Sequence, residues 1–236
     1  MRDWLKMAGI VAVTAILTRF IPFSSFFRSV DTLVHELAHA LATLLLSGSV
    51  MYIHLFGNQS GVTLSAYTDA WMAIPISLAG YMGSALFALL LFLLHAYRRE
   101  RAGLIVVTVL AAVGLALFVR NGYGMVWCAG FAALTALICA IAPPWLRTGY
   151  YLLISFICLV ESVISSFVIL TISILDPGAA GDAANLSRVT FVPAFVWGLF
   201  FTAFSLWCAK LSTGLLFRGG FGRRGAVPHK KSTVSS

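Results

Sequence analysis

The stretch "VDTLVHELAHALATLLLSG", from Val30 to Gly48, decides what kind of fold the chain can have. It is apolar throughout most of its length, yet it contains His35, Glu36 and His39 in an H-E-x-x-H sequence. Ionisable side chains inside a membrane span are costly and usually have a function there. The stretch therefore predicts a membrane helix whose polar side chains face the interior of a helical bundle.

The composition extends this interpretation to the whole chain. Of its 236 residues 60% are hydrophobic and 10% are charged, whereas a soluble domain has roughly 45–50% apolar and 25% charged residues. Because only helices satisfy their own backbone hydrogen bonds in lipid as single segments, we expect an all-α multi-pass membrane protein with six or seven transmembrane helices. The expected spans are 4–23, 30–47, 70–97, 102–119, 122–142, 149–175 and 189–213.

The basic residues lie mainly at the ends of these spans. The net charge is +8, and this placement predicts contact with the lipid bilayer rather than with nucleic acid. The positive-inside rule assigns the loop 98–101, Arg147 and the basic tail 218–236 to the cytoplasmic side, together with Arg28. The loop 176–188 then lies on the far side. The tail is Gly-rich and expected to be disordered, and we expect an integral protein of the plasma membrane.

The interval "VMYIHLFGNQSGVTLSAY", residues 50–67, differs from the spans on either side of it. β-Branched and aromatic residues flank a turn-forming cluster that includes Gly57, Ser60 and Gly61. Two extended runs around such a cluster are typical of a β-hairpin. The sequence thus predicts a short β-hairpin after the H-E-x-x-H helix.

The H-E-x-x-H residues suit a zinc site. His35 and His39 are four residues apart, so they lie on one face of a helix and both can bind one Zn²⁺ ion. Glu36 lies beside them and can accept a proton from a water that the zinc activates. The alternative is a pair of hydrogen-bonded core histidines, but ionisable residues within membranes are rare. The motif predicts metal-assisted hydrolysis of a peptide bond.

A family resemblance rests on these and later residues. The sequence "HELAHALATLLLSGSVMYIHLFGNQSGVT" resembles the site-2 protease group of intramembrane zinc metalloproteases, in particular its compact peptidase-like branch without a PDZ domain. Residues 78–91, "LAGYMGSALFALLL", resemble the Gly-rich span that follows in that group, and 181–197, "GDAANLSRVTFVPAFVW", a late motif of the branch. The resemblance implies a Zn²⁺ cofactor, membrane-embedded protein substrates and a polytopic membrane metalloprotease domain over residues 1–217.

The third zinc ligand is left open between carboxylates, because a catalytic zinc usually has three protein ligands. The larger site-2 proteases supply an Asp from an N-P-D-G or L-D-G sequence, and this chain has no N-P-D-G. Glu161, Asp176 and Asp182 are the candidates. Asp176 stands in "LDPG", where Pro177 favours a turn.

Glu161 and Asp182 are favoured for different reasons. Glu161 lies 14 residues after Arg147 and His35 lies 7 after Arg28, so parallel helices would place them within a turn or two in depth. Asp182 fits the resemblance better, but the expected topology places it on the opposite side from His35. Depth favours Glu161, with Asp182 as the alternative.

Two functions remain in view. One is an intramembrane zinc endopeptidase, in which a hairpin edge with Gly57, Ser60 and Gly61 holds an unwound substrate by β-augmentation. The other is a non-catalytic zinc-binding membrane regulator or scaffold. Glu36 favours the enzyme, because a purely metal-binding site needs the histidines but not this carboxylate.

Overall fold

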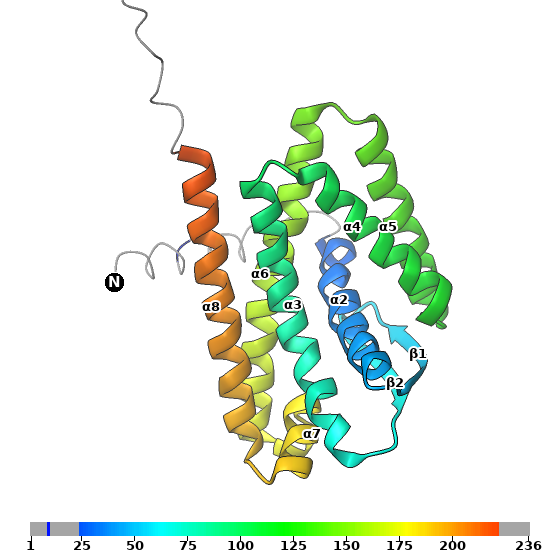
Figure 1. Cartoon of the computed structure of the whole chain (residues 1–236), viewed down its shortest axis with the longest axis vertical. Helices are drawn as coiled ribbons and strands as arrows, with labels where there is room; N and C mark the ends of the chain where they lie inside the picture. Colours follow the sequence, from blue (N-terminus) through cyan, green and yellow to red (C-terminus); the bar gives the residue numbers. More distant parts are fainter. Residues whose placement is uncertain (1–8, 10–23, 222–236) are drawn as a thin grey trace, which may run out of the picture.

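Helix α2 (Ser24–Leu45) runs through the centre of the molecule and carries the H-E-x-x-H sequence (Figure 1). The structure is a computed structural model that describes residues 9 and 24–221. The buried face of α2 includes polar side chains, among them Asp31, Glu36, His39 and Thr43. In a membrane the apolar surface faces lipid, so a polar stripe on a helix is stable only where other protein segments enclose it.

Five helical segments of the described residues are long and apolar enough to cross a membrane, which confirms the multi-pass helical fold. They are formed by η1 (Ala70–Met72) with α3 (Ala73–Ala96), α4 (Glu100–Val113) with the π-helix η2 (Gly114–Phe118), α5 (Gly122–Ile141), α6 (Pro144–Leu175) and α8 (Ala194–Phe221). The expected span 30–47 corresponds to α2, which is not among the five and carries Arg28, Asp31 and Glu36. The expected span 4–23 lies outside the described residues, apart from residue 9.

The helices enclose α2 from several sides. Helices α3, α6 and α8 pack against one another, and α2 contacts both α3 and α6. Helices α4 and α5 form a helical hairpin on the other side of α2 from α8 (Figure 1). A short helix, α7 (Gly181–Thr190), lies at the end of the bundle where α6 stops and α8 begins, and it packs mainly on α3.

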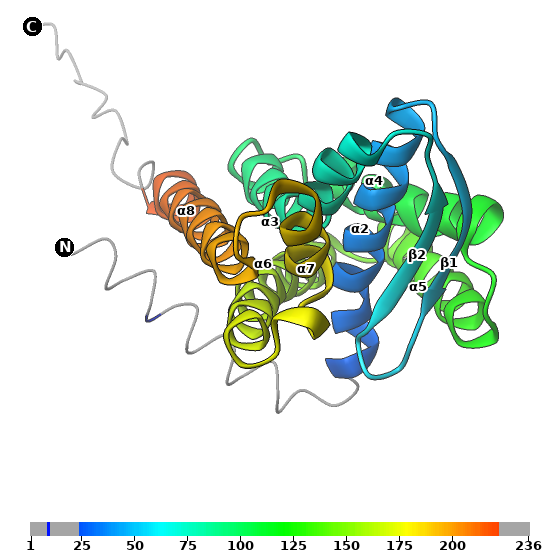
Figure 2. The same cartoon turned by 90° about the horizontal axis from the view of Figure 1, so that it is seen from below.

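The predicted β-hairpin is present. Strands β1 (Ser49–Leu55) and β2 (Gly61–Ala66) pair in antiparallel fashion, and both contact α2. The outer edge of β1 is occupied, because Ile53 bridges to Val119 and the Asn121 side chain bonds the backbone of Leu55 at 3.0 and 2.6 Å. No further strand pairs with β2 among residues 24–221. Viewed from below, α2 lies between α7 on one side and this hairpin on the other (Figure 2).

Three boundaries differ from those expected. The interval 176–188 is not a plain loop, because η3 (Pro177–Ala179) and α7 occupy it. Helix α6 begins at Pro144 rather than at 149, since a proline is favourable in the first turn of a helix. Helix α8 continues to Phe221, beyond the expected domain end at 217, and the rest of the expected tail, 222–236, lies outside the described residues.

Candidate metal centre

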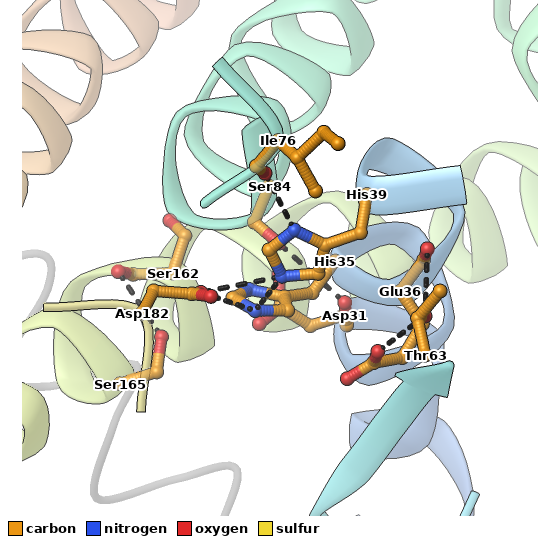
Figure 3. A network of polar contacts seen from close by, with 10 residues as sticks. All are labelled: Asp31, His35, Glu36, His39, Thr63, Ile76, Ser84, Ser162, Ser165 and Asp182. Atoms are coloured by element: carbon orange, nitrogen blue, oxygen red, sulfur yellow. Dashed lines mark hydrogen bonds and ion pairs between the residues drawn. The ribbon is translucent and has the colours of Figure 1, made fainter. Parts of the chain in front are cut away.

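Three side chains from two helices that are far apart in the sequence converge on one point (Figure 3). His35 and His39 come from α2 and Asp182 from the first turn of α7. The two Nε2 atoms are 3.0 Å apart, and Asp182 Oδ2 lies 3.3 Å from that of His35 and 3.2 Å from that of His39. Ligands of a tetrahedral zinc, with bonds of about 2.0–2.2 Å, lie about 3.3 Å from one another. The donor atoms and their spacing therefore fit a zinc ion.

The second nitrogen of His39 is also fixed. Nδ1 lies 2.7 Å from the carbonyl oxygen of Ile76, in the first turn of α3, and donates to it, because a carbonyl can only accept. The lone pair of Nε2 is then directed at His35 and Asp182. Metal-binding histidines typically donate their other N–H in this manner, which fixes the tautomer and the ring orientation.

Helix α3 approaches the two imidazoles closely at Gly80. A Cβ at this position would lie 2.5 Å from Nε2 of both His35 and His39. One turn later, a Cβ at Gly83 would lie 2.5 Å from the Cβ of Ala38. Small residues allow helix backbones to approach, and here they place α3 directly over the candidate ligands.

The carboxylate of Asp182 is largely enclosed, with 13% of its side chain exposed. Burial disfavours its charged form, but the neighbouring imidazoles of His39 and His35 outweigh burial and hold the pKa of the carboxyl below its usual range. No arginine or lysine of residues 24–216 forms an ion pair with it. The cluster thus offers one carboxylate and two imidazole nitrogens, a ligand set that zinc accepts.

Glu36 lies beside the cluster and is covered by β2. Its Oε2 atom accepts a hydrogen bond of 2.6 Å from the Thr63 hydroxyl. A Cβ at Gly61 would lie 2.5 Å from its Oε1 atom, so only glycine lets the strand come this close. The hairpin therefore contacts the expected general base directly, and only 5% of Glu36 is exposed.

Two cavities flank the cluster. The larger, of about 430 Å³, lies between β2 and the ends of α3 and α7, and both histidines, Glu36 and Asp182 line it. The smaller, of about 230 Å³, lies towards the hairpin turn and α6, and His35 and Glu36 line it as well. Substrate-sized space is thus present next to the candidate ligands and the candidate base.

Glu161 is not part of this cluster. It forms an ion pair with Arg28, with Nε to Oε1 at 2.6 Å and the second guanidinium nitrogen to Oε2 at 3.0 Å. Arg28 lies seven residues before His35, which is about 10 Å along a helix. Arg28, and not the histidines, therefore faces the Glu161 carboxylate, and the expected ligation of zinc by Glu161 has no support in this arrangement.

The other predicted residues are placed as follows. Asp182 does not lie on the opposite side from His35, as the expected topology required, because α7 folds back onto α3. Asp176 ends α6 and is exposed. In the hairpin, Gly61 lines both cavities and Ser60 the smaller one, whereas Gly57 lies in the turn beside Tyr123 and lines neither.

The family model described as peptidase M50B-like matches residues 7–212. The chain belongs to the M50B-like peptidase family. This is a family of site-2 protease type, as the sequence resemblance implied, and residues 24–221 of this M50B-like chain contain no PDZ domain. No curated protein and no solved structure matches the chain.

Sequence inspection of this M50B-like peptidase missed three contributors to the site. Thr63 stands in the quoted "SGVT", but its contact with Glu36 depends on which face of β2 meets α2. Tyr81, whose ring centroid lies 4.7 Å from that of His35, stands in the quoted "LAGYMGS", where an aromatic residue within an apolar span gave no distinct signal. The carbonyl of Ile76 is a backbone group, and no residue type marks it.

Proposed function

We propose that this M50B-like peptidase is a zinc endopeptidase that hydrolyses peptide bonds of membrane-embedded proteins. The observation that supports it most is the convergence of His35, His39 and Asp182 beside a cavity that Glu36 also lines. In this proposal the two histidines and Asp182 are the zinc ligands, and Glu161 is a structural residue.

The side chains of the site have two roles in this proposal: the three ligands would hold the zinc ion, and Glu36 transfers a proton. Zinc, when bound, supplies Lewis-acid activation of water and carbonyl groups. Glu36 accepts a proton from the attacking water and later gives it to the leaving nitrogen, as a general base and then a general acid. The Thr63 hydroxyl holds the Glu36 carboxylate on the side of the cavity.

Strand β2 supplies a place for the substrate chain. A helical substrate hides its backbone, so it must be unwound before a peptide bond can be attacked. Residues 61–65 of β2 line the larger cavity, and no described strand occupies the outer edge of β2. An extended segment can therefore add to this edge by β-augmentation, which places its backbone next to the cluster. Gly61 and Ser60 fit this role better than Gly57.

The membrane environment follows from the five candidate spans. We propose that this membrane is the plasma membrane. We also propose that the loop 98–101 and the tail after Arg218 lie on the cytoplasmic side, because this loop is the densest basic loop of the chain. The start of α6, which contains Arg147, lies at the same end of the bundle as the connection from α3 to α4 (Figure 1).

The test of the proposal is Glu36→Gln. An amide keeps the size of the carboxylate but cannot accept the proton, so we expect cleavage to fall about 10²–10⁴-fold while zinc stays bound. A single-span membrane protein is co-expressed with each variant, processing is followed by immunoblot, and zinc is measured on the purified protein.

A matched control is Glu100→Gln, which changes a partly buried glutamate paired with His95 at 3.0 Å, away from the cluster. It is expected to cleave like the wild type. Equal processing by wild type and Glu36→Gln would remove the enzyme proposal and leave a zinc-binding regulator or scaffold.

A further inference from the structure

Tyr81 lies where the two cavities meet, and the mechanism above gives it no role. It follows Gly80 on α3, and it lines both the cavity of about 430 Å³ and the cavity of about 230 Å³. His35 and Glu36 line both cavities as well. Tyr81 therefore borders both cavities next to His35 and Glu36.

The ring of Tyr81 is held from two sides. Its centroid lies 4.7 Å from that of His35 in an edge-to-face contact of 85°. On its other side it stacks on Phe201, with centroids also 4.7 Å apart and an angle of 29°. Phe201 is only 1% exposed, so this support is itself buried. Two aromatic contacts restrict the ring and fix the direction of its hydroxyl.

The hydroxyl itself is uncommitted. No side chain of residues 24–216 forms a hydrogen bond with it, and the carboxylates of Asp182 and Glu36 line the same cavity. Asp182 and Glu36 are the two carboxylates of the proposed reaction site. Because Tyr81 lines both cavities, its hydroxyl can donate a hydrogen bond to an acceptor that enters them.

Peptide hydrolysis creates such an acceptor. When the water oxygen bonds to the carbonyl carbon, the electron pair of the C=O π bond moves onto the carbonyl oxygen, and Glu36 takes the proton of the water. The C–N bond then breaks as the C=O bond re-forms, and the proton passes from Glu36 to the nitrogen. Between these two steps the carbonyl oxygen carries negative charge. A hydrogen-bond donor that is already held in position stabilises this charge best, because the donor does not have to reorient first.

We infer that Tyr81 is a catalytic hydrogen-bond donor, whose hydroxyl binds the carbonyl oxygen as negative charge develops on it. The inference rests on the proposed endopeptidase function. Other neutral donors of the larger cavity include Asn185, which is exposed and has no hydrogen bond or ring contact in residues 24–221 to fix it. Tyr81 differs in being held rigidly and in contacting His35. It keeps its proton during the reaction.

Tyr81→Phe tests the inference, because it removes the hydroxyl and leaves both ring contacts in place. The probe is a phosphinic pseudopeptide, whose tetrahedral phosphorus carries two oxygens in place of the hydrated carbonyl. We expect unchanged zinc content, about 100-fold weaker binding of the probe, and a kcat about 100-fold lower with KM unchanged on a cleaved reporter peptide. The matched control Tyr97→Phe changes an exposed tyrosine at the end of α3 and is expected to behave as wild type.

Each outcome separates this inference from the function on which it rests. Equal probe affinity in Tyr81→Phe and wild type would overturn the donor role, as would loss of zinc in Tyr81→Phe, which would indicate that the residue positions His35. A zinc-loaded wild type that fails to bind the probe would overturn it too. A wild type that binds no zinc would instead overturn the proposed endopeptidase.

Discussion

Helix α2 contributes to two enclosed polar centres, and only one of them contains a guanidinium. In the first, the Arg28 guanidinium faces both oxygens of Glu161 from α6. In the second, Asp182 from α7 faces the imidazoles of His35 and His39. Both carboxylates are enclosed to a similar degree, with side-chain exposures of 10% and 13%.

The difference lies in the partner and not in the burial. A bidentate guanidinium satisfies a carboxylate completely and leaves no position for a metal ion. Two imidazoles offer nitrogen lone pairs in place of a guanidinium fork, and with the Asp182 carboxylate they form a ligand set that a divalent cation completes. A buried acid in a membrane bundle is therefore a candidate ligand when its neighbours are metal-binding side chains, and not when a guanidinium already binds both of its oxygens.

The largest effect is expected from exchanging each carboxylate for an amide. Asp182→Asn removes the charge of the cluster, and we expect zinc affinity to fall on the order of 1000-fold, because ligand binding contributes several kcal/mol per ligand. Glu161→Gln is the matched change in the ion pair and is expected to retain about one zinc per folded protein. Zinc is measured by mass spectrometry after dialysis against a weak chelator. Zinc lost from Glu161→Gln and kept by Asp182→Asn would reverse the assignment.

The ion pair is expected to act on stability instead. Arg28→Met leaves the Glu161 carboxylate buried without a partner, and removing one member of a buried pair typically costs about 3–5 kcal/mol in the free energy of unfolding. The double variant Arg28→Met with Glu161→Leu removes both charges and should recover most of this loss. Unfolding in micelles with increasing SDS measures both. A stable Arg28→Met protein would show that the pair is solvated.

The fold was largely predictable because its signals are local. Long apolar runs identify membrane helices, and a turn cluster between β-branched runs identifies the hairpin. Helix α7 was missed because its 10 residues are few and much less apolar than the spans, and because they follow "LDPG", which is typical of a turn. Without α7, the interval 176–188 had no element that could return Asp182 to the bundle.

The candidate site was predictable only where its residues are neighbours in sequence. His35, Glu36 and His39 share one helix, so their spacing alone brings them together. Asp182 follows His39 by 143 residues (182 − 39), and its position depends on how α6 ends and α7 folds back. Counting residues from Arg28 and Arg147 favoured Glu161, but it could not show that the Arg28 guanidinium itself binds the Glu161 carboxylate.

The smallest of these effects concerns how closely α3 covers the metal cluster. Gly80→Ala adds a Cβ that would lie 2.5 Å from Nε2 of both His35 and His39. Overpacking of this kind typically costs about 1–3 kcal/mol, and here the atoms that must move are the candidate ligand atoms. We therefore expect zinc affinity to fall about 10-fold, measured by competition with a fluorescent chelator.

Gly83→Ala is the matched control, because it changes the same helix one turn later and its Cβ would lie 2.5 Å from the Cβ of Ala38. Both variants push α3 away from α2, so both should lower the free energy of unfolding to a similar extent. Only Gly80→Ala should also weaken zinc binding, since only its Cβ meets the imidazoles. If both variants weakened zinc binding equally, the separation of the two helices, and not the space over the imidazoles, would control the metal cluster.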